Sequence, residues 1–184
     1  MVQPHITTSL PYIYLNPKQT QIPNSNMATL LTAQQQEERS GAEVVHGAEE
    51  CFRHSIELLE ELGFPMGVLP LKDLEECGRV RETGFVWMRQ KAPYEHYFVG
   101  TGTRVSYATE AMAYVEKGKM KRMSGIKSKQ IFIWVPITER SLESGGEKIY
   151  FKTPMGIGKT FPATAFMTDE EKEKLVETEK VEEQ

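Results

Sequence analysis

The side chains best suited to chemistry in this sequence are histidines and carboxylates, but their spacing argues against a metal centre. His46, Glu50 and His54 recur every four residues, which would place them on one side of a helix. A zinc site needs three or four groups that converge at about 2.0–2.3 Å. Because a helix rises 1.5 Å per residue, positions 46 and 54 would lie roughly 12 Å apart. One ion cannot bind both histidines, so we expect a solvated helix face and no metal site.

A second pattern, residues 155–160 (MGIGKT), ends like a phosphate-binding loop. Such a loop surrounds phosphates with glycine-rich backbone, and it requires an earlier glycine and a helix that follows directly. Thr153 stands where the first glycine belongs, and Phe161 and Pro162 stand where the helix must begin. The pattern therefore indicates a turn, and we predict no cofactor.

Nucleophilic catalysis has no recognisable motif here, since the sequence contains no GxSxG elbow. Cys51 falls on the apolar side of a predicted helix, which indicates a buried and inert thiol. His96 lies in the polar segment 93–97 and is the histidine most suited to act as an acid or base, although no partner for it can be identified. We predict no catalytic residue, and an ester hydrolase with His96 as its base is the alternative.

Lysines form the clearest charged pattern. If residues 119–129 are extended without a bulge, alternate side chains share one face of the strand. A lysine stripe there would attract anionic lipid headgroups at about 1 kcal/mol per lysine, which predicts peripheral contact with an anionic membrane. Lysines also protect exposed sheet edges against unwanted pairing, and that interpretation stays open. The headgroup candidates are Lys119, Lys121, Lys127 and Lys129.

These groups must be positioned by secondary structure, and the clearest element is a helix. Residues 40–43 (SGAE) fit a capping box, which predicts a helix start. Apolar residues then recur at spacings of three and four from Val44 to Leu62. Gly63 suits a left-handed cap and Pro65 prevents continuation. Burial of the apolar side would contribute on the order of 10 kcal/mol, so the helix must pack on another layer.

Strand-like segments follow the helix. Turn signals separate them, among them Lys117-Gly118 and residues 144–146 (SGG). Strands without intervening helices indicate an antiparallel sheet, so we expect a mainly β (α+β) domain with one N-terminal amphipathic helix packed on the sheet. The expected strands span residues 84–89, 97–100, 104–115, 119–129, 130–137, 147–153 and 159–166.

Residues 131–135 (IFIWV) suggest the function, because they show no alternation between apolar and polar side chains. A strand that is apolar on both faces is expected between two layers. The helix would cover one face, and a second sheet or a ligand cavity the other. The leading hypothesis is a non-catalytic binding module for an apolar or amphipathic small molecule such as a lipid. The candidate lining residues are Phe85, Trp87, Tyr107, Phe132, Trp134 and Phe151.

Composition sets the remaining limits. The length of 184 residues predicts one domain, and we divide the chain into a flexible extension (1–39), a globular domain (40–167) and an acidic tail (168–184). The near-neutral central part argues against nucleic-acid binding. A protein-interaction module that uses the sheet edge or the tail is the other alternative, and the sequence names no protein partner.

The two cysteines are too few for a disulfide scaffold. No apolar run approaches the roughly 18 residues that a membrane span needs, and the first residues lack the features of a secretory signal. A soluble, cytoplasmic protein is therefore expected. The alternatives are a transit peptide in residues 1–35, which would indicate an organelle, and a working start at Met27.

Several segments resemble the plant family labelled domain of unknown function 538. The resemblance covers about two thirds of the chain, from about Val45 to Phe166, and its most specific part is the helix stop with two prolines. The matching segments are residues 63–71 (GFPMGVLPL), 83–87 (TGFVW), 105–107 (VSY), 118–136, 149–151 (IYF) and 161–163 (FPA).

This resemblance implies a strongly curved antiparallel sheet or barrel with one N-terminal helix. Members look similar in shape to half of the lipid-binding bactericidal permeability-increasing domain, which suggests an apolar or lipid ligand. The family has no settled activity and no agreed catalytic residues, so none is transferred to this chain. Many relatives are secreted, whereas a secretory signal is not recognised here.

Overall fold

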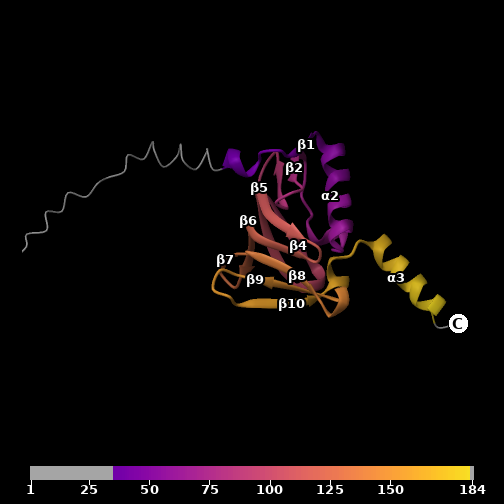
Figure 1. The fold of residues 1–184 in the computed structure, drawn as a ribbon. Coiled ribbons are helices and arrows are strands. Elements are labelled where there is room, and N and C mark those ends of the chain that lie inside the picture. Colours follow the sequence, from indigo (N-terminus) through magenta and orange to yellow (C-terminus); the bar gives the residue numbers. More distant parts are fainter. Residues whose placement is uncertain (1–34, 183–184) are drawn as a thin grey trace, which may run out of the picture. The chain divides into compact units, whose positions relative to one another are not determined.

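The computed structural model describes residues 35–182 (Figure 1). Most of the extension predicted for residues 1–39 and the alternative start at Met27 lie outside the described residues. Residues from Gln36 onward form one unit. In that unit the Arg39 guanidinium pairs with Glu110 at 2.8 Å, and the Tyr114 hydroxyl donates to Glu38 at 2.9 Å. The folded unit therefore includes residues that precede the predicted boundary at 40.

Strands account for most of the elements. The helices are α2 (Ala48–Leu62) and α3 (Asp169–Glu182), and short 3-10 turns span Met66–Val68, Val99–Thr101, Ser144–Gly146 and Ala163–Phe166. The strands are β1 (Glu43–His46), β2 (Leu74–Val80), β3 (Phe85–Gln90), β4 (Tyr94–Phe98), β5 (Thr103–Glu116), β6 (Lys119–Gln130), β7 (Ile133–Pro136), β8 (Glu139–Glu143), β9 (Lys148–Lys152) and β10 (Gly158–Pro162).

The ten strands form one antiparallel sheet, which confirms the predicted class. Their order is β1-β2-β3-β5-β6-β8-β9-β10, with β4 paired to β5 and β7 paired to β6. Within the described residues β1 and β10 each have one neighbour, so the sheet is not closed. Strands β1, β2 and β8 are additions that the sequence patterns did not predict.

The predicted helix start at Ser40 is wrong. Residues Glu43–His46 form β1, which pairs with residues 76–79 of β2, and α2 begins after Gly47 without a side-chain cap. The reason is tertiary: strand pairing satisfies the backbone of this segment, and such contacts override a local helix signal. His46 therefore lies on a strand, and it cannot share a helix face with Glu50 and His54.

The helix ends as its sequence predicts. Gly63 adopts a left-handed conformation with φ 80°, its N–H donates to the Glu60 carbonyl, and the Phe64 N–H donates to the Leu59 carbonyl at 2.9 Å. These two bonds are those of a Schellman motif. They satisfy carbonyls that the last helical turn would otherwise leave without partners.

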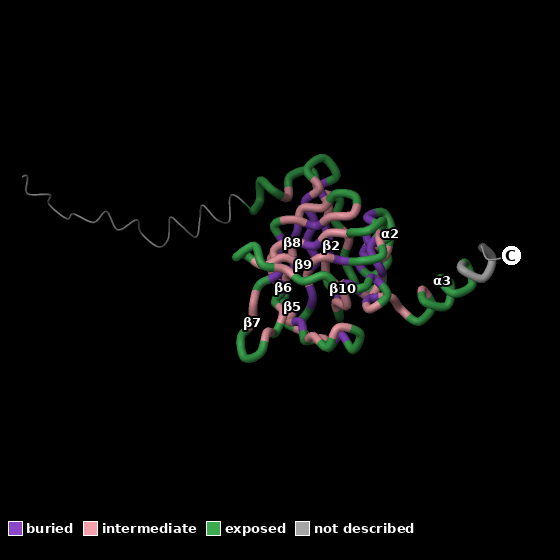
Figure 2. The backbone as a smooth tube through the Cα atoms, turned by 90° about the horizontal axis from the view of Figure 1, so that it is seen from below, coloured by how far each residue is buried: buried purple, intermediate pink, exposed green. Residues whose placement is uncertain are grey.

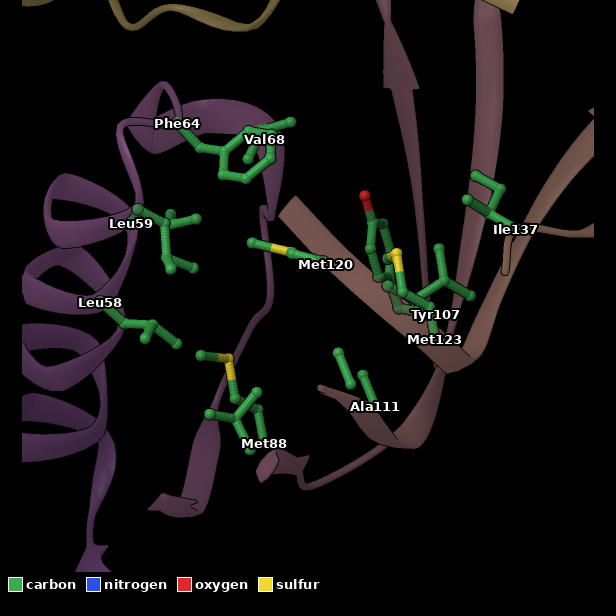
Figure 3. Packing of buried hydrophobic residues seen from close by; sticks show 14 of the residues in the cluster. Leu58, Leu59, Phe64, Val68, Met88, Tyr107, Ala111, Met120, Met123 and Ile137 are labelled. Atoms are coloured by element: carbon green, nitrogen blue, oxygen red, sulfur yellow. The ribbon is translucent and has the colours of Figure 1, made fainter. Parts of the chain in front are cut away.

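Helix α2 lies beside β1 and β2 in Figure 1, and its buried side chains enter the core. Leu58 and Leu59 face Met88 and Met120 in Figure 3. Phe52, which the periodicity places with the apolar residues, is 62% exposed. A second cluster contains Val80, Phe85 and Trp87. The Trp87 indole N–H donates a hydrogen bond to the Glu76 carboxylate at 2.8 Å.

Strands β5 and β6 change partners along their length. The first half of β5 pairs with β4 and the second half with β3, and the register between β5 and β6 is irregular after Tyr107. Gly125 occupies the irregular region with φ 79°, where a Cβ would lie 2.1 Å from the Glu110 carbonyl oxygen. The buried Gln90 amide donates to the Ala108 carbonyl at 2.9 Å. These contacts fix the point at which β5 leaves one neighbour for the other.

The prediction that residues 131–135 lie between two layers is wrong. Ile131 and Phe132 form the turn between β6 and β7 and are 86% and 92% exposed, and Ile133 is also exposed. Ile131 has φ 55° at this turn, and among the described strands β7 pairs with β6 alone. Figure 2 shows this exposed turn beside β7. The segment is a solvent-facing hairpin and not a buried strand.

The other turns follow the predictions. Lys117-Gly118 joins β5 to β6, and residues 144–146 join β8 to β9. The phosphate-loop-like residues 155–160 lie in the β9–β10 hairpin and continue into strand β10 instead of an α-helix. Thr168 and Glu171 form a reciprocal capping box at the start of α3. Within residues 35–182, neither α2 nor α3 is long and apolar enough to cross a membrane.

Candidate functional site

A cavity of about 90 Å³ lies among strands from both halves of the sheet. It is bounded by the start of β5 and the ends of β4 and β6, by β8, β9 and β10, and by the 3-10 turns Met66–Val68, Val99–Thr101 and Ala163–Phe166. Its inner wall is mainly apolar. The buried apolar lining consists of Val68, Phe98, Val105, Ile137 and Phe166, with Phe151 and Phe161 partly buried beside them.

Aromatic contacts hold this wall in place. Phe166 lies at the centre, with ring centroids 5.2 Å from Phe98, 5.2 Å from Phe151 and 6.3 Å from Phe161. Tilted and edge-to-face pairs of this kind are favourable by about 0.5–1.5 kcal/mol beyond area burial. The segment Ala163–Phe166 follows β10 directly, so the end of the sheet supplies one side of the cavity.

Two polar side chains interrupt the apolar wall. Tyr107 on β5 is fully buried, and its hydroxyl has no hydrogen-bond partner among the described residues. Arg140 on β8 is 1% exposed; its Nη1 donates to the Val68 carbonyl at 3.2 Å, while its buried Nε has no partner within residues 35–182. Figure 3 shows the Tyr107 side chain between Met120 and Ile137.

Burial governs the protonation of both groups. It raises the pKa of the Tyr107 hydroxyl, which therefore stays protonated and able to donate a hydrogen bond. It lowers the pKa of Arg140 to about 10, against a smaller opposing effect of Tyr107. Arg140 is still a cation at neutral pH, and the cavity thus contains a positive charge and a hydroxyl donor.

The mouth of the cavity differs from its interior. Lys129 and Lys159 are exposed there, together with Ile157, which is 67% exposed. Three exposed apolar loops adjoin the lining through Thr101, Gln130 and Ile157. Their exposed apolar residues are Val99, Ile131, Phe132, Ile133, Met155 and Ile157.

Of the six predicted lining residues, the structure brings two to the cavity, Tyr107 and Phe151. Phe85 and Trp87 pack in the second cluster, away from that lining. Phe132 is at the exposed turn, and Trp134 is a half-buried residue on β7 whose ring lies 5.6 Å from the Lys129 ammonium. Phe132 and Trp134 miss the cavity because the prediction placed residues 131–135 inside the fold, where the structure has an exposed hairpin.

Arg140 is the residue that sequence reasoning missed. It stands on β8, a strand that was not predicted, between Glu139 and Ser141 in a polar segment with no apolar alternation. Arginine is almost never fully buried unless it is paired, so residue type also argued for the surface. The buried positions Val68 and Phe166 had weak signals too, because each lies in a short 3-10 turn.

The four lysines of the predicted stripe separate into two pairs. Lys119 and Lys121 form ion pairs with Glu139 at 3.0 Å and Glu116 at 2.6 Å. Lys127 and Lys129 lie at the other end of β6, where Lys129 borders the cavity. The assumption of an unbroken strand does not hold, because Arg122 has φ 48° and Gly125 φ 79°.

The three histidines among residues 35–182 lie outside the lining of this cavity. His96 on β4 has its Nδ1 3.3 Å from the Tyr94 hydroxyl, and its ring packs against Phe98. Burial, with a smaller effect of Lys72, lowers the pKa of His96. In the part of the chain that the structure describes, no three His, Cys, Asp or Glu residues are grouped closely enough to hold a metal ion.

A second, smaller cavity of about 70 Å³ lies between α2 and strands β2 and β3. Charged side chains dominate it, among them Glu61 and Arg79. These two form a bidentate ion pair, with N···O distances of 2.6 and 2.7 Å between the guanidinium and the carboxylate. Since its charges are already paired with each other, the apolar cavity is the stronger candidate site.

Fold and cavity together define a mainly β protein in which an open antiparallel sheet borders an apolar cavity with one buried cation. A family model described as "Protein of unknown function, DUF538" matches residues 55–167, which is more than half of the chain. The chain belongs to this family, and the resemblance stated from the sequence is confirmed. No curated protein and no solved structure matched the chain.

Proposed function

We propose that this protein is a non-catalytic binding module that takes an apolar or amphipathic small molecule, such as a lipid, into the cavity between β5 and β10. The observation that carries the proposal is the cavity itself, with an apolar inner wall and a mouth that reaches the surface. Ligand sites are typically concave and mostly apolar, with a small number of placed polar groups. Tyr107 and Arg140 are such groups.

The proposal includes a strongly curved sheet. Strands β5 and β10 stand well apart in the strand order, yet residues of both line one cavity. Curvature would bring them together and would explain the irregular pairing of β5 with β6, since bulges bend strands.

Peripheral contact with an anionic membrane is a second part of the proposal. Three apolar loops with Lys129 and Lys159 border the cavity mouth. Apolar side chains that enter the interface, combined with lysines, are the features that hold a protein on anionic lipid. Such contact would deliver a lipid directly to the cavity.

Binding of 1-octanol, a neutral molecule with an alkyl chain, tests the binding proposal. We expect 1-octanol, titrated into ¹⁵N-labelled protein, to shift the amide signals of Val105, Tyr107 and Phe151 in a saturable manner. Thr103→Phe places a large side chain in the lining and should weaken binding about tenfold or more, equivalent to about 1.4 kcal/mol. Thr160→Phe adds the same side chain at an exposed position of β10 and should leave binding unchanged.

Melting temperatures of both variants must first show that they fold. A wild-type protein that gives no saturable shifts with 1-octanol would contradict the proposal. Equal losses of binding in Thr103→Phe and Thr160→Phe would place the site elsewhere.

A further inference from the structure

The buried guanidinium of Arg140 lacks a counter-charge. Its neighbour on β8, Glu139, pairs instead with Lys119 at 3.0 Å and Lys152 at 3.6 Å. Adjacent residues of a strand point to opposite faces, which explains why Glu139 does not reach it. Among residues 35–182 no carboxylate forms an ion pair with Arg140, and no carboxylate contributes to the shift of its pKa.

The other contacts of Arg140 only partly replace water. The guanidinium carbon lies 5.1 Å from the centre of the Phe151 ring, and Nη1 donates to the Val68 carbonyl. Its Nε remains without a partner, and so does the Tyr107 hydroxyl. Buried polar groups are normally hydrogen-bonded, and each exception requires an explanation. These two atoms belong to residues that line the same cavity, whereas the other buried atoms without a partner among residues 35–182, Arg39 Nε and Arg79 Nε, lie outside its lining.

We infer that the ligand of this cavity carries a carboxylate at its buried end, which forms a charge-assisted pair with Arg140 and accepts a hydrogen bond from the Tyr107 hydroxyl. This inference rests on the proposed function and adds the ligand's class: an apolar monocarboxylic acid. The acid enters head first, and its carbon chain follows the apolar wall toward Ile157 at the mouth.

Charge favours a carboxylate over a phosphate dianion, and the shape of the guanidinium fits a carboxylate. A guanidinium presents its donors in a planar fork that matches the two oxygens of a carboxylate. Arg140 contributes one positive charge, which a monoanion balances, whereas a phosphate dianion would leave a buried negative charge. Of the three lysines in the lining, Lys129 and Lys159 are exposed at the mouth, and Lys152 pairs with Glu139 at 3.6 Å.

The size of the cavity agrees with this orientation. At about 90 Å³ it is smaller than the roughly 150 Å³ of an engineered cavity that holds benzene. The carboxylate and the first carbons would fill the space between Tyr107, Arg140 and Phe166. The remainder of the chain would then extend past Phe161 to the surface.

Octanoate and 1-octanol, which share a chain length and differ in the head, test the inference by calorimetry. We expect the wild-type protein to bind octanoate at least about tenfold more tightly than 1-octanol, as expected for a charge-assisted pair. Arg140→Met should reduce that ratio to below about twofold. Tyr107→Phe removes only the hydroxyl. It should weaken the binding of octanoate about three- to tenfold and leave the affinity for 1-octanol unchanged.

Lys159→Met is the matched control, because it removes a cation at the mouth instead of the interior. The octanoate preference should survive in this variant. Its loss there, with retention in Arg140→Met, would show that the carboxylate lies at the mouth and would overturn the inference. If Arg140→Met does not fold, Tyr107→Phe and Lys159→Met decide the result.

The outcomes separate the two proposals. If neither compound binds, the proposed binding function fails. If both bind equally well, the binding function stands and the inference fails, since water would then satisfy Arg140 and Tyr107.

Discussion

Cys77 shows at the scale of one residue how burial changes reactivity. Its Sγ lies 3.8 Å from the Cys51 carbonyl oxygen and 4.0 Å from the Ser55 hydroxyl, in the layer between α2 and β2. Burial, followed by the nearby Cys51, raises the pKa of the Cys77 thiol. The thiolate is the reactive form of cysteine, so the folded protein should hold Cys77 in its unreactive form.

We predict that iodoacetamide at pH 8.5 modifies Cys77 at least about tenfold more slowly in the folded protein than in urea, where roughly half of free cysteine is ionised. Because the folded pKa is raised, the associated stability is present below the unfolded pKa and is lost as pH rises toward the folded value. Peptide mass spectrometry would measure the rates. Phe52→Cys, at an exposed position of the same helix, should react at once, and equally fast modification of Cys77 would refute its burial.

Residue type and periodicity predicted burial only where the two agreed. Cys51 was expected in the core and is fully buried, because its helical spacing and its type both favour burial. Phe52 shows the limit, since the helix turns it away from β2 although its type is apolar. Arg140 had neither signal, because only its tertiary neighbours place it inside the cavity.

Gly63 connects the residue scale to the element scale. Its φ of 80° lies in the left-handed region, and a Cβ there would sit 3.4 Å from Leu142 Cδ1. A side chain must therefore overcome a backbone preference as well as a close contact. Both costs are largest for a β-branched residue.

Gly63→Val should lower the free energy of unfolding by about 1 kcal/mol or more. For a folded unit of this size, the melting temperature should fall by about 2–4 °C per kcal/mol. Gly63→Asn is the matched variant, because asparagine tolerates the left-handed conformation better than other side chains do. Its free energy of unfolding should fall clearly less than that of Gly63→Val. Calorimetric unfolding would compare the three proteins, and equal melting temperatures would show that the Schellman cap does not contribute to stability.

Elements with internal signals were predicted well, and elements defined by their partners were not. The end of α2 and the capping box of α3 are local, and both are as predicted. The helix start at Ser40 failed because β2 pairs with residues 43–46. Residues 131–135 failed because an apolar run shows that side chains avoid water, and it does not show whether a partner covers them.

At the scale of the whole molecule, exposed apolar side chains gather around one opening. Val99, Ile131, Phe132 and Met155 are each more than four-fifths exposed, and their loops adjoin the cavity lining. Large exposed apolar patches commonly mark interaction sites. The nearby lysines favour an anionic lipid surface as the partner that we propose.

Phe132→Ser should therefore weaken binding to vesicles that contain anionic lipid. Burial of one large apolar side chain is worth about 1.5–3 kcal/mol, so the partition coefficient should fall roughly tenfold or more, as co-sedimentation with phosphatidylserine vesicles would show. Phe52→Ser removes the same residue type from an exposed position of α2, where Phe52 is 62% exposed, and should leave binding unchanged. Because lysines contribute about 1 kcal/mol each near such a surface, added salt should also weaken the binding of the wild-type protein to these vesicles. Equal binding by the two serine variants would mean that the loops at the cavity mouth do not face the membrane, and the cavity would then have to receive its ligand from solution.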